Sequence, residues 1–168
     1  MKVALGLITK YINEYDYSNM ANILKDKEHI FYLGRGIDYY LSMEGSLKLK
    51  EISYIHSEAF QAGELKHGSI SLIDKDFGVV SVVTDKTISD KTISNLKEVS
   101  ARGAKIITIT NIKDNNFADY TILVEDYDEI LNPLLVIVPM QMLAYNVAKL
   151  RDCDIDKPRN LAKSVTVE

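Results

Sequence analysis

Compact apolar runs alternate with amphipathic stretches along most of the chain. Four runs are nearly continuous in aliphatic and aromatic residues, which is typical of strands covered on both faces, and they lie at 29–33, 79–83, 105–109 and 120–124. Helical patterns lie before, between and after them, at 2–14, 17–27, 38–55, 86–102 and 130–150. Strands that alternate with helices form parallel sheets with right-handed crossovers. The sequence therefore predicts an α/β fold with a doubly wound parallel sheet in three layers, α/β/α.

The predicted helix at 38–55 is unusual because charged and apolar residues project into one narrow arc. At about 100° per residue, this arc contains Glu44, Lys48 and Glu51. Its apolar members are Tyr40, Leu41, Ile52 and Ile55. We expect the solvated face of the helix elsewhere, at Ser42, Ser46, Lys50 and Ser53.

Two explanations fit charges that lie beside apolar side chains. Unpaired charge is costly to desolvate, so a protein that places it there is a candidate for a functional site. Glu44 and Lys48 also have the i,i+4 spacing of a structural ion pair. The pattern alone leaves both explanations open.

The run at 29–33 leads into the tight turn Gly34-Arg35-Gly36, which precedes the charged helix. Ligands of parallel sheets bind beyond the carboxyl ends of the strands. Two glycines allow close backbone approach, and the start of a helix can receive an anion. Gly34 and Arg35 are therefore candidate substrate contacts, although a plain strand-to-helix turn is the alternative. The motif lacks the three spaced glycines of a dinucleotide site.

The last helical stretch and the tail differ from the rest of the chain. Residues 131–150 are apolar on almost every side, which predicts a buried helix or an oligomer contact, with a kink or restart at Pro139. Its proline, glutamine and asparagine argue against a membrane span. After Asp152 no helical stripe remains, and the cations Arg159 and Lys163 lie on an irregular segment. This tail is either disordered or closes over an anion such as a phosphorylated sugar.

Composition narrows the class of protein. The chain has 168 residues, enough for one domain with a proper core, and no repeat or linker divides it. A formal net charge of −4 gives no general attraction for nucleic acid or membranes. The single cysteine, Cys153, fits a packed residue in a reducing, cytoplasmic setting. The spacing of His56, Glu58, Glu64 and His67 fits no zinc signature, so we expect no metal and no cofactor.

Two long segments of the chain carry a family resemblance. They read EGSLKLKEISYIHSEAFQAGELKHG at 44–68 and KPRNLAKSVTVE at 157–168, and FYLGRG at 31–36 and ARGAKIITIT at 101–110 fit as well. Together they resemble the isomerising glutamine–fructose-6-phosphate aminotransferases, the glucosamine-6-phosphate synthases, over nearly all of residues 29–168. The resemblance points to the second of two sugar isomerase (SIS) modules. It implies an N-terminal helical segment at 1–28, an SIS domain at 29–152 and an active-site tail at 153–168.

The resemblance also implies roles for individual residues of the central segment. Glu51 matches the general base that moves a proton between C1 and C2 of the sugar. Lys48 matches a lysine that contacts the open-chain substrate, and Glu44 matches a supporting acid of the same helix. His67 matches the histidine that helps to open the sugar ring in the active site of the neighbouring subunit. A homodimer is therefore expected.

The tail has implied roles of its own. Lys163 matches the lysine proposed to form a Schiff base with fructose 6-phosphate, which requires a neutral amine. Arg159 stands where a tail arginine helps to order that site. Leu161 and Ala162 match residues that line the route for ammonia.

Parts of the family enzyme are missing from this sequence. The glutamine-hydrolysing domain uses an N-terminal cysteine, whereas Met1 is followed here by Lys2. No S-x-S-x-x-T loop for the sugar phosphate occurs, and Ser69 replaces the usual proline after His67-Gly68. We therefore expect an excised module that forms little glucosamine 6-phosphate without a glutaminase domain and a first SIS module. The alternative function is a non-catalytic SIS module that binds sugar phosphates or serves in assembly.

Overall fold

The computed structural model describes residues 2–113, 116–128 and 130–161. Its centre is one sheet of five parallel strands in the order β2-β1-β3-β4-β5. These strands are β1 (His29–Gly34), β2 (His56–Gln61), β3 (Gly78–Val83), β4 (Lys105–Thr110) and β5 (Tyr120–Leu123). The five α-helices are α1 (Lys2–Asn13), α2 (Ser18–Leu24), α3 (Ile37–Ser53), α4 (Ser89–Ser100) and α5 (Asn132–Leu150). The predicted doubly wound α/β fold is confirmed.

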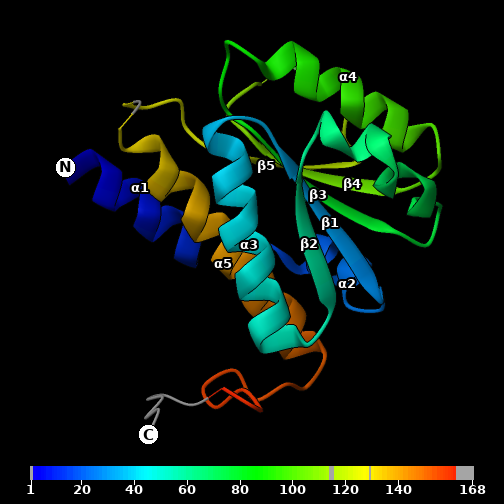
Figure 1. Ribbon diagram of the computed structural model, residues 1–168. Coiled ribbons are helices and arrows are strands. Elements are labelled where there is room, and N and C mark those ends of the chain that lie inside the picture. Colours follow the sequence, from blue (N-terminus) through cyan, green and yellow to red (C-terminus); the bar gives the residue numbers. More distant parts are fainter. Residues whose placement is uncertain (1, 114–115, 129, 162–168) are drawn as a thin grey trace, which may run out of the picture.

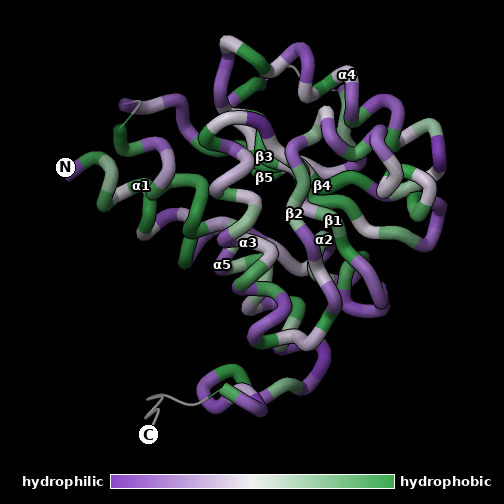
Figure 2. The backbone as a smooth tube through the Cα atoms, viewed as in Figure 1, coloured by the Kyte–Doolittle hydropathy of each residue, from purple (hydrophilic) through white to green (hydrophobic). Residues whose placement is uncertain are grey.

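One layer of helices covers each face of the sheet (Figure 1). Residues of α1, α2, α3 and α5 share one hydrophobic core with one face of the strands. On the other face, α4 and the two short 3₁₀ helices, η1 (Glu64–His67) and η2 (Ser69–Leu72), enclose a second core. Figure 2 shows hydrophobic residues along the strands between these layers. The strands at 29–33, 79–83, 105–109 and 120–124 were predictable because burial on both faces makes their sequences continuously apolar.

Strand β2 is absent from the sequence-based prediction. It is an edge strand that pairs in parallel with β1, with His29 opposite His56 and Gly34 opposite Gln61. Its first residues alternate between exposed and buried side chains, since His56 and Glu58 are exposed around the buried Ser57. A strand with one solvated face has no continuous apolar run, so the pattern that finds buried strands misses it.

The predicted solvated face of α3 is wrong. Ser42, Ser46 and Ser53 are at most 2% exposed, and of that set only Lys50 faces solvent. The Ser42 and Ser53 hydroxyls donate to carbonyls four residues earlier, and Ser46 donates to the Ser57 hydroxyl of β2. Serines whose hydroxyls are satisfied in this way pack as small residues, so α3 can approach its neighbours closely.

Helix α5 fills the remaining space of the core beside α3. Its buried face contains Leu135, Val136, Met140 and Leu143, and the helix continues through Pro139 without a restart. In the described part of the chain it is the one helix whose length and composition would allow it to cross a membrane. Here its buried side chains lie in the same core as α3 and the strands. The prediction of a buried helix holds for one face only, since eight of its nineteen residues are buried and Leu134, Tyr145 and Leu150 are 42–52% exposed.

Candidate active site

Helix α3 begins at the switch point of the sheet. The chain leaves β1 for β2 on one side and then returns to β3 on the other side, so the carboxyl ends of β1 and β3 border a crevice. The turn between β1 and α3 requires its two glycines, Gly34 and Gly36. A Cβ on Gly34 would lie 2.4 Å from the backbone carbonyl atoms of Asp38, and Gly36 has a φ of 55°. This turn therefore fixes where α3 starts.

The carboxylate of Asp38 occupies the crevice at this switch point. Asp38 is 3% exposed, and its Oδ2 accepts hydrogen bonds from the backbone N–H groups of Thr84 (2.7 Å) and Asp85 (3.1 Å). The Thr84 hydroxyl donates to Oδ1. The Asp38 carboxylate therefore satisfies these hydrogen-bond donors of Thr84 and Asp85, in the loop after β3. Burial raises the pKa of this carboxyl, although the hydrogen bonds act in the opposite direction.

Asp38→Asn should remove the pH dependence that this buried carboxylate gives to stability. A carboxyl whose folded pKa is raised contributes full stability below its unfolded value of 3.8, and loses it as the pH rises through the folded pKa. The asparagine can keep all three hydrogen bonds, because its amide can donate to the Thr84 hydroxyl. Urea unfolding between about pH 3.5 and 7 should therefore show that wild type loses stability relative to Asp38→Asn as the pH rises.

Asp38→Ala is the matched comparison. It leaves the N–H groups of Thr84 and Asp85 without their acceptor, and should destabilise the fold by about 1–3 kcal/mol at every pH. Parallel pH profiles of wild type and Asp38→Asn would contradict a raised pKa of the Asp38 carboxyl in the folded protein.

Arg35 turns away from α3. Its Nη2 donates to Asn95 Oδ1 of α4 at 3.1 Å, and its guanidinium lies against Gly63, where a Cβ would meet Nη2 at 2.3 Å. The residue that the sequence suggests as a substrate contact therefore links the turn to the layer of α4.

The predicted charged residues of α3 form one cluster. The Lys48 Nζ lies 2.8 Å from Glu51 Oε2 and 3.8 Å from Glu44 Oε1. The hydrogen bond that Lys48 donates to Glu51 raises the pKa of the lysine and keeps it charged. The three side chains are 26–38% exposed, so they lie on the open face of α3. Glu51 follows the start of the helix by fourteen residues, or about 21 Å, which places it far from the switch point.

The outward face of α3 also carries apolar side chains. They are 41–65% exposed and comprise Ile37, Tyr40, Met43 and Leu47. The charged cluster therefore borders an apolar stripe that nothing in the described part of the chain covers.

The C-terminal segment lies against the end of α3. The Arg159 N–H donates to the Tyr54 hydroxyl at 2.9 Å, and the Arg159 guanidinium lies 4.1 Å from the centre of the tyrosine ring. Tyr54 follows Glu51 by less than one helical turn. A hollow of about 610 Å³ lies here, lined by residues that include Lys25, Arg151 and Arg159. Leu161 is half exposed, whereas Ala162 and Lys163 lie outside the described residues.

Within one chain, His67 lies away from the charged cluster of Glu44, Lys48 and Glu51 on α3. It ends η1, is 76% exposed, and its Nε2 lies 3.9 Å from Glu64 Oε2. Its neighbour Leu65 belongs to the core below α4, whereas Leu49 of α3 belongs to the core on the opposite face of the sheet.

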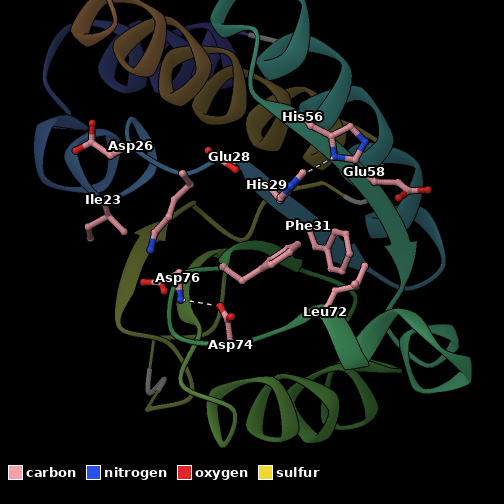
Figure 3. Close-up of a pocket in the computed structure, with 12 residues that line it drawn as sticks. Ile23, Asp26, Glu28, His29, Phe31, His56, Glu58, Leu72, Asp74 and Asp76 are labelled. Carbon is pink, nitrogen blue, oxygen red and sulfur yellow. Dashed lines mark hydrogen bonds between the residues drawn. The ribbon is translucent and has the colours of Figure 1, made fainter.

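A second hollow, of about 880 Å³, lies away from the charged cluster, at the amino ends of β1 and β2 (Figure 3). His29 and His56 lie side by side there, with their Nδ1 atoms 3.2 Å apart. Phe31 and Phe77 form an aromatic floor, and the surrounding carboxylates are exposed. Across residues 2–113, 116–128 and 130–161, no group of three or more histidine, cysteine or acidic side chains could hold a metal ion.

A family model for the SIS domain matches residues 23–151. The chain belongs to the SIS domain family. An isomerising glutamine–fructose-6-phosphate aminotransferase of Gluconobacter oxydans is 48% identical over 157 residues, which cover 91% of this chain and 26% of that protein. The same enzyme of Methanosarcina mazei is 54% identical over 141 residues, covering 82% of this chain and 23% of that protein.

A solved structure agrees with these relatives. The C-terminal domain of glucosamine-fructose-6-phosphate aminotransferase from Francisella tularensis superposes with a TM-score of 0.78 at 38% identity, and the match covers 92% of this chain and 43% of that domain. This SIS module is therefore homologous to the C-terminal SIS region of these aminotransferases, and spans about a quarter of the length of the curated relatives.

Sequence reasoning did not single out two polar residues of the SIS module. Asp38 could have been noticed as an acid in the first turn after a glycine-rich strand end, but its partners are 46 and 47 residues away. Tyr54 carried no signal beyond its place at the end of a helix, because its partner Arg159 is 105 residues away.

Proposed function

We propose that this SIS module is the C-terminal part of the isomerase domain of a glutamine–fructose-6-phosphate aminotransferase. Its substrate is fructose 6-phosphate, its product is glucosamine 6-phosphate, and ammonia comes from glutamine hydrolysed by another domain. The observation that carries the proposal is the cluster in which Lys48 lies between Glu51 and Glu44 on the open face of α3. The identity to the relatives that bear this name supports it.

The proposed chemistry divides between α3 and the tail. Conversion of a ketose into an aldose requires a base that takes a proton from C1 and returns it to C2, and Glu51 serves as this base. Lys48, held at 2.8 Å from Glu51, orients the carboxylate and contacts the open-chain sugar, with Glu44 in support. Lys163 forms a Schiff base at the substrate carbonyl, with loss of water. Arg159 orders the segment that carries it, and Ala162 and Leu161 border the ammonia route.

The module requires other parts of the enzyme to complete this site. Glu51 is 26% exposed, and a base that works on a carbon acid needs protection from bulk water. More than half of the Francisella domain lies outside the match to this chain, so a further module of comparable size can cover the apolar stripe on α3. We propose that the first SIS module does so. His67 acts in the site of a partner subunit, in a cytoplasmic homodimer.

The chain alone should not catalyse the reaction. Incubation with fructose 6-phosphate and a high concentration of ammonium should yield little or no glucosamine 6-phosphate, because the sequence contains no S-x-S-x-x-T loop and its base is partly open to water. The positive arm is a chimera in which this chain replaces the homologous module of the Gluconobacter enzyme. We expect the chimera to form glucosamine 6-phosphate from glutamine and fructose 6-phosphate.

Two results would overturn the proposal. One is a chimera that assembles at the size of the parent enzyme, hydrolyses glutamine and yet forms no amino sugar. The other is turnover by the isolated chain near that of the intact enzyme. Light scattering tests the dimer separately, since a strictly monomeric chimera would contradict the role of His67 across subunits.

A further inference from the structure

We propose that Arg35 is a positioning residue that holds η1 against α4 and against the turn between β1 and α3, and thereby fixes the place from which His67 extends. The link to catalysis rests on the proposed function, in which His67 acts in the site of a partner subunit. The contacts of Arg35 are independent of that function, since they join three segments of one chain.

The start of η1 makes room for the Arg35 side chain. Gly63, which precedes η1, has a φ of −72° and a ψ of −32°, ordinary helical values that any residue adopts. Its own backbone therefore does not require glycine. A Cβ at position 63 would instead meet the guanidinium of Arg35, with Nη2 at 2.3 Å, Cζ at 3.1 Å and Nη1 at 3.4 Å. These are the three atoms nearest to that position, so glycine is needed here to accommodate Arg35.

The same guanidinium is anchored on α4. Its Nη2 donates to Asn95 Oδ1 at 3.1 Å, and Asn95 is 6% exposed. Within residues 2–113, 116–128 and 130–161, Arg35 forms no ion pair, and its buried Nε has no hydrogen-bond partner. Burial of a cation without a carboxylate costs free energy, so charge neutralisation does not account for its position. The planar fork of arginine does, because it can lie against a peptide and donate within its plane.

Two further contacts hold the segment that contains η1. The Ala62 N–H donates to the Gly34 carbonyl of the turn at 2.9 Å. The Lys66 Nζ lies 2.6 Å from Glu98 Oε1, and Glu98 shares a face of α4 with Asn95 because the two are three residues apart. This ion pair is 37–48% exposed and is therefore screened by water. The guanidinium of Arg35 provides the better protected attachment.

His67 depends on these attachments, because no hydrogen bond holds its ring in the described part of the chain. The residue is 76% exposed, and its Nε2 lies 3.9 Å from Glu64 Oε2, too far for a hydrogen bond. It follows Gly63 by four residues, or about 8 Å along a 3₁₀ helix. A shift of Gly63 is therefore passed on to His67, and a misplacement of about 1 Å can lower a rate by about 10²-fold.

Amide hydrogen exchange of the chain tests the attachment. Arg35→Met removes the guanidinium, and Gly63→Ala displaces it with a methyl group without removing it. Arg102→Met removes an exposed arginine just after α4 and is the matched control. We expect the Ala62 amide to exchange at least about fivefold faster in the first two variants and at the wild-type rate in the control.

A double substitution shows whether Gly63 acts through Arg35. In an Arg35→Ala background, a Cβ at position 63 no longer meets the guanidinium, so Gly63→Ala should accelerate Ala62 exchange by less than about twofold. An acceleration of the same size in both backgrounds would overturn the attachment. Unchanged exchange in Arg35→Met, with the fold intact by circular dichroism, would overturn it as well.

Mixed dimers of the chimeric enzyme test the link to His67. Each site takes Glu51 from one subunit and His67 from the other, so pairing a Glu51→Gln subunit with a His67→Asn subunit leaves one site intact. The Arg35→Met homodimer should have a kcat about tenfold lower or less, with a smaller change in KM. Paired with Glu51→Gln through two affinity tags, Arg35→Met should recover about half of the wild-type kcat, because one of the two symmetric sites is intact.

A substitution that harms its own subunit gives a different result. If Arg35→Met impaired the fold or α3 of its own chain, pairing with Glu51→Gln would leave no intact site. Absence of recovery would therefore overturn the role of Arg35 in placing His67, as would an Arg35→Met homodimer with the wild-type kcat. Pairing of Arg35→Met with His67→Asn is the internal control, and its kcat should not exceed that of the Arg35→Met homodimer.

The two arms separate the possible failures. No recovery when Glu51→Gln is paired with His67→Asn, combined with faster Ala62 exchange in Arg35→Met, would refute the proposed function and leave the attachment standing. Recovery in that pairing, combined with unchanged Ala62 exchange in Arg35→Met, would refute the attachment and leave the proposed function standing.

Discussion

Glu51→Gln in the chimeric enzyme is expected to lower kcat for glucosamine 6-phosphate by about 10²–10⁴-fold, the usual contribution of a general base. Glutamine has nearly the same shape as glutamate and can still accept the hydrogen bond from Lys48, but it cannot take a proton from carbon. The measurement is steady-state formation of amino sugar, together with exchange of the C1 proton of fructose 6-phosphate into deuterated water.

The neighbouring carboxylates provide controls for this experiment. Glu44→Gln should lower kcat less than Glu51→Gln does, because the Glu44 carboxylate is the more distant partner of Lys48. Its Oε1 lies 3.8 Å from the Lys48 Nζ, whereas the Glu51 Oε2 lies at 2.8 Å. Glu58→Gln changes an exposed glutamate of β2 and should leave kcat unchanged. Proton exchange at C1 that persists in Glu51→Gln at the wild-type rate would exclude Glu51 as the base and confine the cluster on α3 to a structural ion pair.

Gly34→Ala is expected to cause the largest loss of stability, about 3 kcal/mol in the free energy of unfolding. The new Cβ would lie 2.4 Å from the carbonyl carbon and oxygen of Asp38 and 2.6 Å from the Tyr39 nitrogen. These are backbone atoms of the first turn of α3, so the clash can be relieved only by moving the helix. Urea unfolding monitored by circular dichroism measures the change.

Gly6→Ala is the matched control for this substitution. Gly6 lies on an exposed part of α1, and a Cβ there would meet nothing within 4 Å. Alanine should therefore raise the stability by about 0.5–1 kcal/mol, because glycine is a poor helix former. A Gly34→Ala protein as stable as wild type would show that the turn tolerates a side chain and does not fix the start of α3.

The sequence predicts the elements whose environment is uniform and misses those that depend on distant partners. The strands at 79–83 and 105–109 are buried on both faces, so composition alone reveals them. Edge strand β2 alternates at its start between solvent and core and was therefore missed. On α3, helical spacing places the serines outside the arc of the charged residues, and therefore predicts that they face solvent. Their hydroxyls are satisfied by nearby carbonyls or by Ser57, so small size, not polarity, decides where they lie.

The candidate site shows the same division. Glu44, Lys48 and Glu51 lie on one helix, so helical spacing was sufficient to predict that they meet. The carboxylate of Asp38 finds its donors in a loop after another strand, and Tyr54 finds Arg159 at the far end of the chain. Such contacts arise only after the sheet and the tail are in place. No periodicity in the sequence encodes them.

Gly45 lies on the face of α3 that packs against α5 and β1. A Cβ on Gly45 would lie 2.5 Å from the Met140 sulfur of α5 and 2.9 Å from the Tyr32 ring of β1, so at this position the backbone of the helix itself contacts its neighbours. A contact this close leaves no space for even one added methyl group, because protein interiors are close-packed. A side chain at position 45 would therefore displace α3 from α5 and β1, and would shift the helix that carries Glu51.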